Sequence, residues 1–158
     1  MACRGGPVTR PNEARRPRVL IDADALFAGA ASPSEHSASI VLLRMAEITL
    51  IDALTSQQVI TEAERNLRAK LPRALPAFHM LVQRCLRVTP DPSPEKVAEH
   101  EGRAHAKDLP ILVCAMREGC PWLVTFNVSD YKPGHPEVTV LRPGDFVQEA
   151  RYLLGRLN

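Results

Sequence analysis

The chain has 158 residues, of which 45% are apolar, and its formal net charge is +2. This length suits one domain with a single core, so we expect no second domain. No apolar stretch approaches the roughly 18 residues that span a bilayer, no signal-peptide pattern opens the chain, and the four cysteines contain no C-x-x-C pair, so a soluble cytoplasmic protein is predicted.

The positive charge is concentrated at the N-terminus. Residues 1–18 carry five arginines against one acidic residue, Glu13, a net of +4, so the rest of the chain is net negative. Such a Pro-, Gly- and Arg-rich segment does not favour a packed element, and a basic tail attracts nucleic acid. We therefore predict a disordered basic extension over 1–17, or a start codon placed too early, and a domain over 18–158.

The first half of the domain begins with a short apolar run, Val19-Leu20-Ile21, that ends in Asp22. The run is too brief for a helix and suits a strand buried on both faces. A helix is predicted over 37–49 and a strand over 50–54. Thr55-x-x-Gln58 matches a capping box, so a second helix is predicted from there to the residue before Pro72.

The second half continues the alternation of helices and short apolar strands. Helices are predicted over 76–85, 95–101, 108–119 with Asp108 as N-cap, and 145–157, and strands over 86–88, 122–125 and 138–141. Helices that alternate with short apolar strands indicate an α/β fold. The prediction is a single α/β domain with a mainly parallel central sheet and helices on both faces.

Oxygen-bearing side chains stand where strands end or helices begin. They are Asp22, Glu62, Asp108 and the pair Asn127 and Asp130. The carboxyl ends of parallel strands meet at one edge of a sheet, so these side chains are expected to converge, and converging carboxylates need a cation. Taken singly, each has an ordinary explanation: a turn or helix cap for Asp22, Asp108 and Asp130, and a solvated helix position for Glu62.

The joint pattern resembles the PIN-domain family over about residues 18–146. The segments that carry the resemblance are Val19-Leu-Ile-Asp22-Ala-Asp24-Ala-Leu26, Val59-Ile60-x-Glu62-x-x-Arg65-Asn66-Leu67, Lys107-Asp108-x-Pro110-Ile111-Leu112-x-x-Ala115 and Leu123-Val124-Thr125-Phe126-Asn127-x-x-Asp130-Tyr131. The resemblance implies a three-layer α/β/α fold and a metal-dependent ribonuclease that hydrolyses phosphodiester bonds. Many relatives are the toxin halves of toxin–antitoxin pairs.

The resemblance also implies roles for the acidic residues. Asp22, Glu62 and Asp108 occupy the family's metal-binding positions, which suit Mg²⁺ or Mn²⁺ because these ions prefer hard oxygen ligands. Many members have Thr-x-Asp where this chain has Thr125-Phe126-Asn127. An amide oxygen still binds a hard cation but carries no charge, and Asp130 is predicted to restore that charge in the metal shell.

Other residues are assigned around the expected metals. Thr125 is expected to orient the substrate or a neighbouring carboxylate. Asp24 is expected to contact the metal-binding residues without binding the metal itself, or to anchor the loop. Arg65 and Lys107 are the expected contacts to the phosphates of the RNA substrate. With 4% aromatic residues, recognition by base stacking is not expected, and the five histidines fit no zinc spacing and are predicted at surface or helix positions.

Two alternative functions and one partner surface complete the predictions. A PIN-fold RNA-binding or regulatory protein without turnover is favoured if Asn127 leaves a metal unsupported. Asp22-x-Asp24 also resembles the opening of haloacid-dehalogenase-type phosphatases, for which Thr55 or Ser56 would supply a hydroxyl, although the late acidic pair is missing. The helix over 37–49 is apolar on more than one face, which indicates a homodimer or antitoxin contact, or simply core burial.

Overall fold

Five short strands form one parallel sheet in the computed structural model, which describes residues 16–31 and 37–156. The strands are β1 (Arg18–Ile21), β2 (Asp52–Ser56), β3 (Arg87–Thr89), β4 (Trp122–Val124) and β5 (Thr139–Leu141). Their order is β3-β2-β1-β4-β5, and every pairing is parallel. The predicted α/β fold with a mainly parallel sheet is therefore confirmed. The extension predicted over 1–17 lies, for residues 1–15, outside the described residues.

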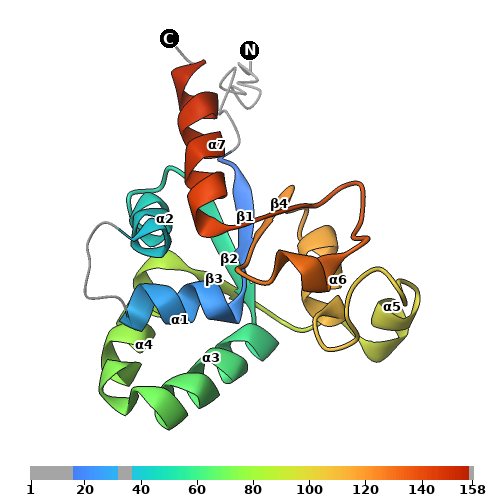
Figure 1. Ribbon diagram of the computed structural model, residues 1–158, viewed down its shortest axis with the longest axis horizontal. Coiled ribbons are helices and arrows are strands. Elements are labelled where there is room, and N and C mark those ends of the chain that lie inside the picture. Colours follow the sequence, from blue (N-terminus) through green and yellow to red (C-terminus); the bar gives the residue numbers. More distant parts are fainter. Residues whose placement is uncertain (1–15, 32–36, 157–158) are drawn as a thin grey trace, which may run out of the picture.

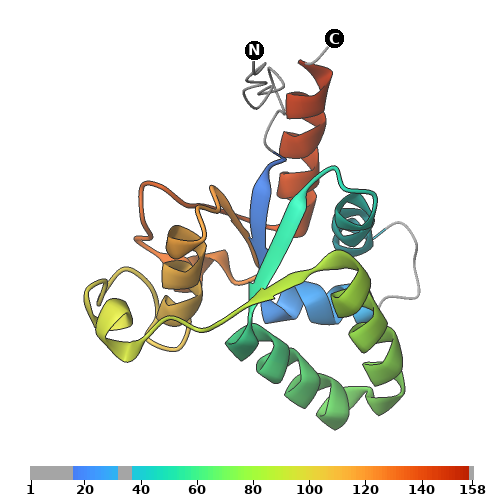
Figure 2. The ribbon, with the colours of Figure 1, turned by 180° about the vertical axis from the view of Figure 1, so that it is seen from behind.

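Helices cover the sheet from both sides (Figures 1 and 2). One group consists of α1 (Ala23–Ala31), α2 (Ala38–Glu47), α3 (Gln57–Lys70), α4 (Leu75–Cys85) and α7 (Pro143–Gly155), and the other of α5 (Pro94–Ala98) and α6 (Leu109–Arg117). Two short 3₁₀ turns complete the described elements: η1 (Pro72–Ala74) lies between α3 and α4, and η2 (Val128–Tyr131) lies between β4 and β5. None of the described helices is long and apolar enough to cross a membrane.

The central strands are buried on both faces, which explains their continuous apolar sequences. Leu20, Leu54 and Leu123 have no exposed surface, and they belong to the three neighbouring strands at the middle of the sheet. Burying one such side chain contributes about 1.5–3 kcal/mol. The core therefore holds β1, β2 and β4 in register, and this register fixes where each strand ends.

Three predicted details differ from the structure. The strand expected over 50–54 lies two residues later, and the cap of α3 is Ser56, whose hydroxyl accepts a hydrogen bond from the backbone N–H of Val59, rather than Thr55. The Thr55 hydroxyl instead donates to the Ile21 carbonyl at 2.9 Å, because pairing with β1 draws Thr55 into the sheet. Helix α1 was not predicted, since it starts directly after Asp22, a residue that the sequence reading assigned to the end of a strand.

Replacement of Ser56 by alanine tests the corrected cap. The change removes the side-chain acceptor for Val59 and is expected to lower the free energy of unfolding by about 1 kcal/mol, measured by urea denaturation. Ser56→Thr keeps the acceptor and serves as the control. An unchanged stability in Ser56→Ala would mean that the start of α3 is held by other contacts.

Candidate functional site

The site lies at the carboxyl ends of β1 and β4. From β1 the chain continues to β2 and β3 on one side of the sheet, whereas β4 and β5 lie on the other, so the strand order reverses between β1 and β4. Ligands of open α/β sheets bind in the crevice at such a reversal. A cavity of about 120 Å³ opens in the structure, lined by Asp22, Ala23, Asp24, Glu62, His105, Lys107, Asp108, Asn127 and Asp130.

The cavity residues come from distant parts of the chain. Asp22 directly follows β1 and Asp24 lies in the first turn of α1, whereas Glu62 projects from the second turn of α3. Asp108 precedes α6, and Asn127 and Asp130 belong to the segment after β4. The fold thus brings together the acidic and amide side chains that the sequence singled out.

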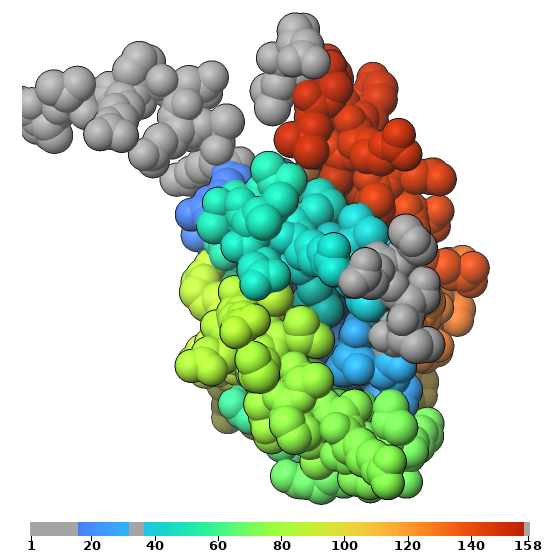
Figure 3. Space-filling model, turned by 90° about the vertical axis from the view of Figure 1, so that its left-hand side faces the viewer, coloured from blue at the N-terminus to red at the C-terminus, as the bar shows by residue number. Residues whose placement is uncertain are grey.

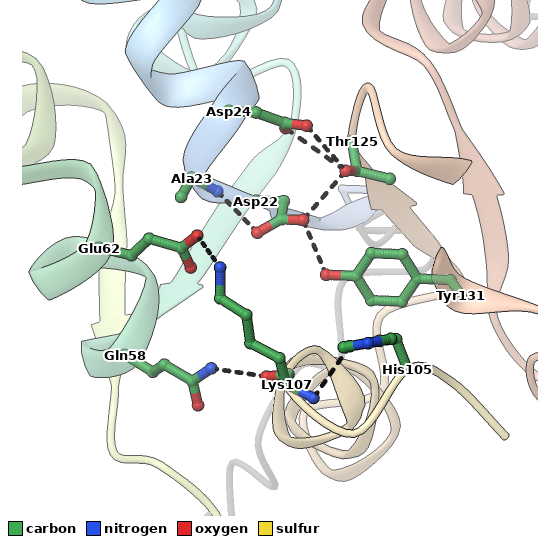
Figure 4. Close-up of polar contacts among 9 residues, drawn as sticks. All are labelled: Asp22, Ala23, Asp24, Gln58, Glu62, His105, Lys107, Thr125 and Tyr131. Carbon is green, nitrogen blue, oxygen red and sulfur yellow. Dashed lines mark hydrogen bonds and ion pairs between the residues drawn. The ribbon is translucent and has the colours of Figure 1, made fainter. Parts of the chain in front are cut away.

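Asp22 is the buried centre of the site, with 7% of its surface exposed. Its Oδ1 accepts a hydrogen bond from the backbone N–H of Ala23 at 2.7 Å, and its Oδ2 accepts one from the hydroxyl of Tyr131 at 2.7 Å and one from that of Thr125 at 3.0 Å (Figure 4). Burial raises the pKa of Asp22 from 3.8 to about 6, against the lowering effect of these hydrogen bonds, and the nearby charge of Asp24 adds to the rise. The hydrogen bonds therefore offset only part of the lost hydration.

Thr125 connects Asp22 with Asp24. Its hydroxyl lies 3.0 Å from Oδ2 of Asp22 and 3.3 Å from Oδ2 of Asp24, which also accepts the backbone N–H of Phe126 at 3.1 Å. Burial raises the pKa of Asp24 above its ordinary value. Thr125 itself has no exposed surface, and its hydroxyl contacts are those of a residue that orients two carboxylates.

Asp108 stands at the N-cap position of α6, as predicted, but its carboxylate does not act as the cap. Within the described part of the chain, no hydrogen bond joins this side chain to the first turn of the helix, and the side chain lines the cavity instead. Burial and the charges of Asp130 and Glu62 raise the pKa of Asp108, whereas Lys107 and His105 oppose the rise. Helix capping therefore does not explain this aspartate.

A lysine provides positive charge at the rim. The ammonium group of Lys107 lies 3.0 Å from Oε1 of Glu62, which raises the pKa of the lysine, and its backbone carbonyl accepts a hydrogen bond from Gln58. Of the described side chains that line the cavity, five are carboxylates and Lys107 is the single lysine or arginine. Arg65 is exposed on α3, one turn beyond Glu62, and does not line the described cavity.

Two residues at the site were not assigned a role from the sequence. His105 is exposed, as expected, and it also lines the cavity. Its Nδ1 accepts the backbone N–H of Lys107 at 3.3 Å, so that in the neutral ring Nε2 carries the proton. The hydroxyl of Tyr131 donates a hydrogen bond to Asp22. The position of Tyr131 directly after Asp130 in the last motif was the sequence signal that could have indicated this role, whereas no spacing pattern in the sequence indicates a role for His105.

The donor set fits a hydrated divalent cation. Five carboxylates supply hard oxygen atoms around one small cavity, and burial raises the pKa of Asp22, Asp24 and Asp108, because it removes water from their charged forms. Within residues 16–31 and 37–156, no three Asp, Glu, His or Cys side chains are grouped closely enough to hold one ion by themselves. Mg²⁺ usually keeps several waters and takes one or two carboxylates, so the arrangement suits it better than a fully dehydrated ion.

Comparisons with known proteins agree with this architecture. A family model described as PIN domain matches residues 18–129. Among solved structures, VapBC2 from Rickettsia felis bound to a DNA fragment from their promoter is similar, with a TM-score of 0.60 and 16% identity over 79% of this chain and 98% of that chain. Mycobacterium tuberculosis VapC20, described as a sarcin–ricin loop cleaving toxin, has a TM-score of 0.56 and 19% identity over 76% of this chain and 98% of that chain. FitAB bound to the IR36 DNA fragment has a TM-score of 0.52 and 16% identity over 79% of this chain and 94% of that chain. No curated protein matches the chain.

The raised pKa of Asp22 predicts how stability depends on pH in metal-free protein. A carboxyl whose pKa is higher in the folded state than in the unfolded state stabilises the fold while it is protonated. This contribution to the free energy of unfolding is fully present below the unfolded-state pKa of 3.8 and is lost as the pH rises through the folded-state pKa of about 6. The loss from this group is about 3 kcal/mol by neutral pH.

Urea unfolding in EDTA from about pH 4 to about pH 8 measures this loss. In Asp22→Asn the decline with pH should shrink, whereas in Asp145→Asn, an exposed aspartate in the first turn of α7, it should match the wild type. An identical decline in wild type and Asp22→Asn would show that Asp22 does not titrate with a raised pKa.

Proposed function

The chain belongs to the PIN-domain family, and from that premise we propose that it is a Mg²⁺- or Mn²⁺-dependent RNA endonuclease, acting as the toxin of a toxin–antitoxin pair. The observation that carries the proposal is the convergence of five carboxylates in one cavity at the reversal of the strand order. Carboxylates gathered in one cavity repel one another and destabilise the fold, and a bound cation removes this repulsion.

Asp22, Glu62, Asp108 and Asp130 are the proposed ion-holding residues. A bound Mg²⁺ or Mn²⁺ supplies Lewis-acid activation of water and neutralises charge on the phosphodiester. Hydrogen bonds from Ala23, Thr125 and Tyr131 hold the Asp22 carboxylate in one orientation. Asn127 contributes a neutral amide at the cavity wall, and Asp130 on the same turn supplies the charge that an asparagine lacks.

Lys107 and Arg65 are proposed to meet the phosphates of the RNA. The Lys107 ammonium lies at the cavity rim and is largely exposed, so it can approach a phosphate without losing its contact with Glu62. Arg65 lies further along α3, where it would serve the phosphates that flank the site. RNA as the substrate class is supported by the family and by the described activity of the VapC20 relative.

The phosphatase alternative loses its structural support. A phosphatase of that type needs a hydroxyl after the second strand to bind phosphate, yet Thr55 donates to the Ile21 carbonyl and Ser56 caps α3. Both hydroxyls are buried and are used by the fold. Neither hydroxyl is therefore available to bind a phosphate at the site.

A partner protein, either an antitoxin or a second copy of the chain, is proposed at the end of α2. Leu42 and Leu43 are buried in the core, so part of the apolar surface of this helix is explained by packing against α1, α4 and α7. Ile48, directly after α2, remains 64% exposed. Figure 3 shows α2 on the surface of the molecule, between α4 and α7.

Cleavage of RNA in the presence of Mn²⁺ tests the proposed activity. Wild type should cut a mixed RNA pool, and Asp108→Asn should lower the rate by about 10²-fold or more, because it removes a charge that balances the cation. Asp145→Asn, which changes an exposed aspartate far from the cavity, is the matched control and should cut like wild type.

Three further results separate the candidate functions. EDTA should abolish cutting, and added Mn²⁺ should restore it. A wild type that binds metal but cuts no RNA with any divalent ion would favour the binding protein without turnover. Hydrolysis of small phosphate monoesters with intact RNA would instead favour a phosphatase.

A further inference from the structure

The hydroxyl of Tyr131 makes a direct hydrogen bond to the buried carboxylate at the centre of the site. Tyr131 ends η2 and has 2% of its surface exposed, and its hydroxyl lies 2.7 Å from Oδ2 of Asp22 (Figure 4). A phenol has an ordinary pKa of about 10, so it carries its proton at neutral pH. The Tyr131 hydroxyl is therefore a hydrogen-bond donor to this one oxygen.

The hydrogen bonds use the two oxygens of Asp22 unequally. A carboxylate offers about four lone-pair sites, two on each oxygen. Within residues 16–31 and 37–156, Oδ2 accepts from both Tyr131 and Thr125, whereas Oδ1 accepts from the Ala23 N–H alone. Oδ1 thus keeps acceptor capacity for a cation, and the capacity of Oδ2 is filled.

Tyr131, rather than Thr125, secures this asymmetry. The Thr125 hydroxyl has a single proton and lies within 3.4 Å of oxygen atoms from two carboxylates, Asp22 and Asp24, so its donation is divided between them. The described hydrogen bond of the Tyr131 hydroxyl goes to Asp22. Removing this phenol would open a lone pair on Oδ2 even with Thr125 in place.

We propose that Tyr131 is a positioning residue that makes Asp22 a one-oxygen ligand and so sets a preference for Mg²⁺ and Mn²⁺ over Ca²⁺. Ca²⁺ accepts six to eight oxygen ligands and readily takes both oxygens of one carboxylate, whereas Mg²⁺ requires a compact octahedron built from single oxygens and waters. The inference rests on the proposed function, because it requires that the cavity bind a divalent ion. It adds a determinant of which ion is bound.

Titration calorimetry with Mn²⁺, Mg²⁺ and Ca²⁺ tests the inference on the full chain without RNA. At about pH 7.5, wild type should bind Mn²⁺ more tightly than Ca²⁺. Tyr131→Phe keeps the ring and removes only the hydroxyl, and the ratio of Mn²⁺ to Ca²⁺ affinity should fall by about tenfold. A general loss of structure would weaken all three ions together and leave the ratio unchanged.

The second tyrosine of the chain provides a matched control. Tyr152→Phe removes the same hydroxyl from an exposed residue of α7 and should leave the ratio at its wild-type value. If Tyr131→Phe does not fold, Thr125→Val, with Thr125→Ser as the control that keeps the hydroxyl, tests the same oxygen from the other side. Because Tyr131 still donates to Oδ2, the ratio in Thr125→Val should stay near its wild-type value, and a roughly tenfold fall would overturn the assignment to Tyr131.

The outcomes separate this inference from the proposed function. An unchanged ion ratio in folded Tyr131→Phe, with a wild type that binds Mn²⁺ and cuts RNA, overturns the role of Tyr131 and leaves the nuclease intact. A wild type that binds none of the three ions overturns both. A lower ratio in Tyr131→Phe supports the inference whether or not RNA is cut.

Discussion

A buried carboxylate holds the site together. Asp22 lies at the end of the central strand β1, where the core excludes most of its water, and donors from three separate segments replace that hydration. Those segments are the first turn of α1, the end of β4 and the short turn η2. A carboxylate left without partners in a core costs several kcal/mol, and these hydrogen bonds offset part of that cost. The same contacts therefore shape both the fold and the site.

The compensation at Asp22 is incomplete, and this has a functional meaning. Burial keeps its pKa raised, as it does those of Asp24 and Asp108; the charge of Asp24 adds to the rise at Asp22, and those of Asp130 and Glu62 add to the rise at Asp108. A protein that only needed stability would replace such a cluster with apolar side chains. Retained negative charge in a small polar cavity is instead the arrangement that attracts a divalent cation, and perturbed carboxylates of this kind gather at functional sites.

The prediction from the sequence succeeded where a local signal was strong. The apolar runs of β1 and β4 identified buried strands, and the acidic residues placed after strands or on helices were found in one cavity. It failed where a neighbour in space decides the structure. Thr55 looked like a helix cap, but pairing of β2 with β1 draws it into the sheet and leaves the cap to Ser56. Helix α1 escaped notice because Asp22, a residue read as the end of a strand, also binds its first N–H.

The sequence by itself determined the class of fold and the set of carboxylates that meet, because apolar periodicity and strand ends are encoded over a few adjacent residues. Only the tertiary structure decided how that set is organised. Thr125 and Tyr131 lie 103 and 109 positions from Asp22 along the chain, and Lys107 lies 45 positions from its partner Glu62. No local pattern specifies pairs so far apart. They follow from the strand order, which places the end of β4 beside the end of β1 and thereby selects the donors that reach the buried carboxylate.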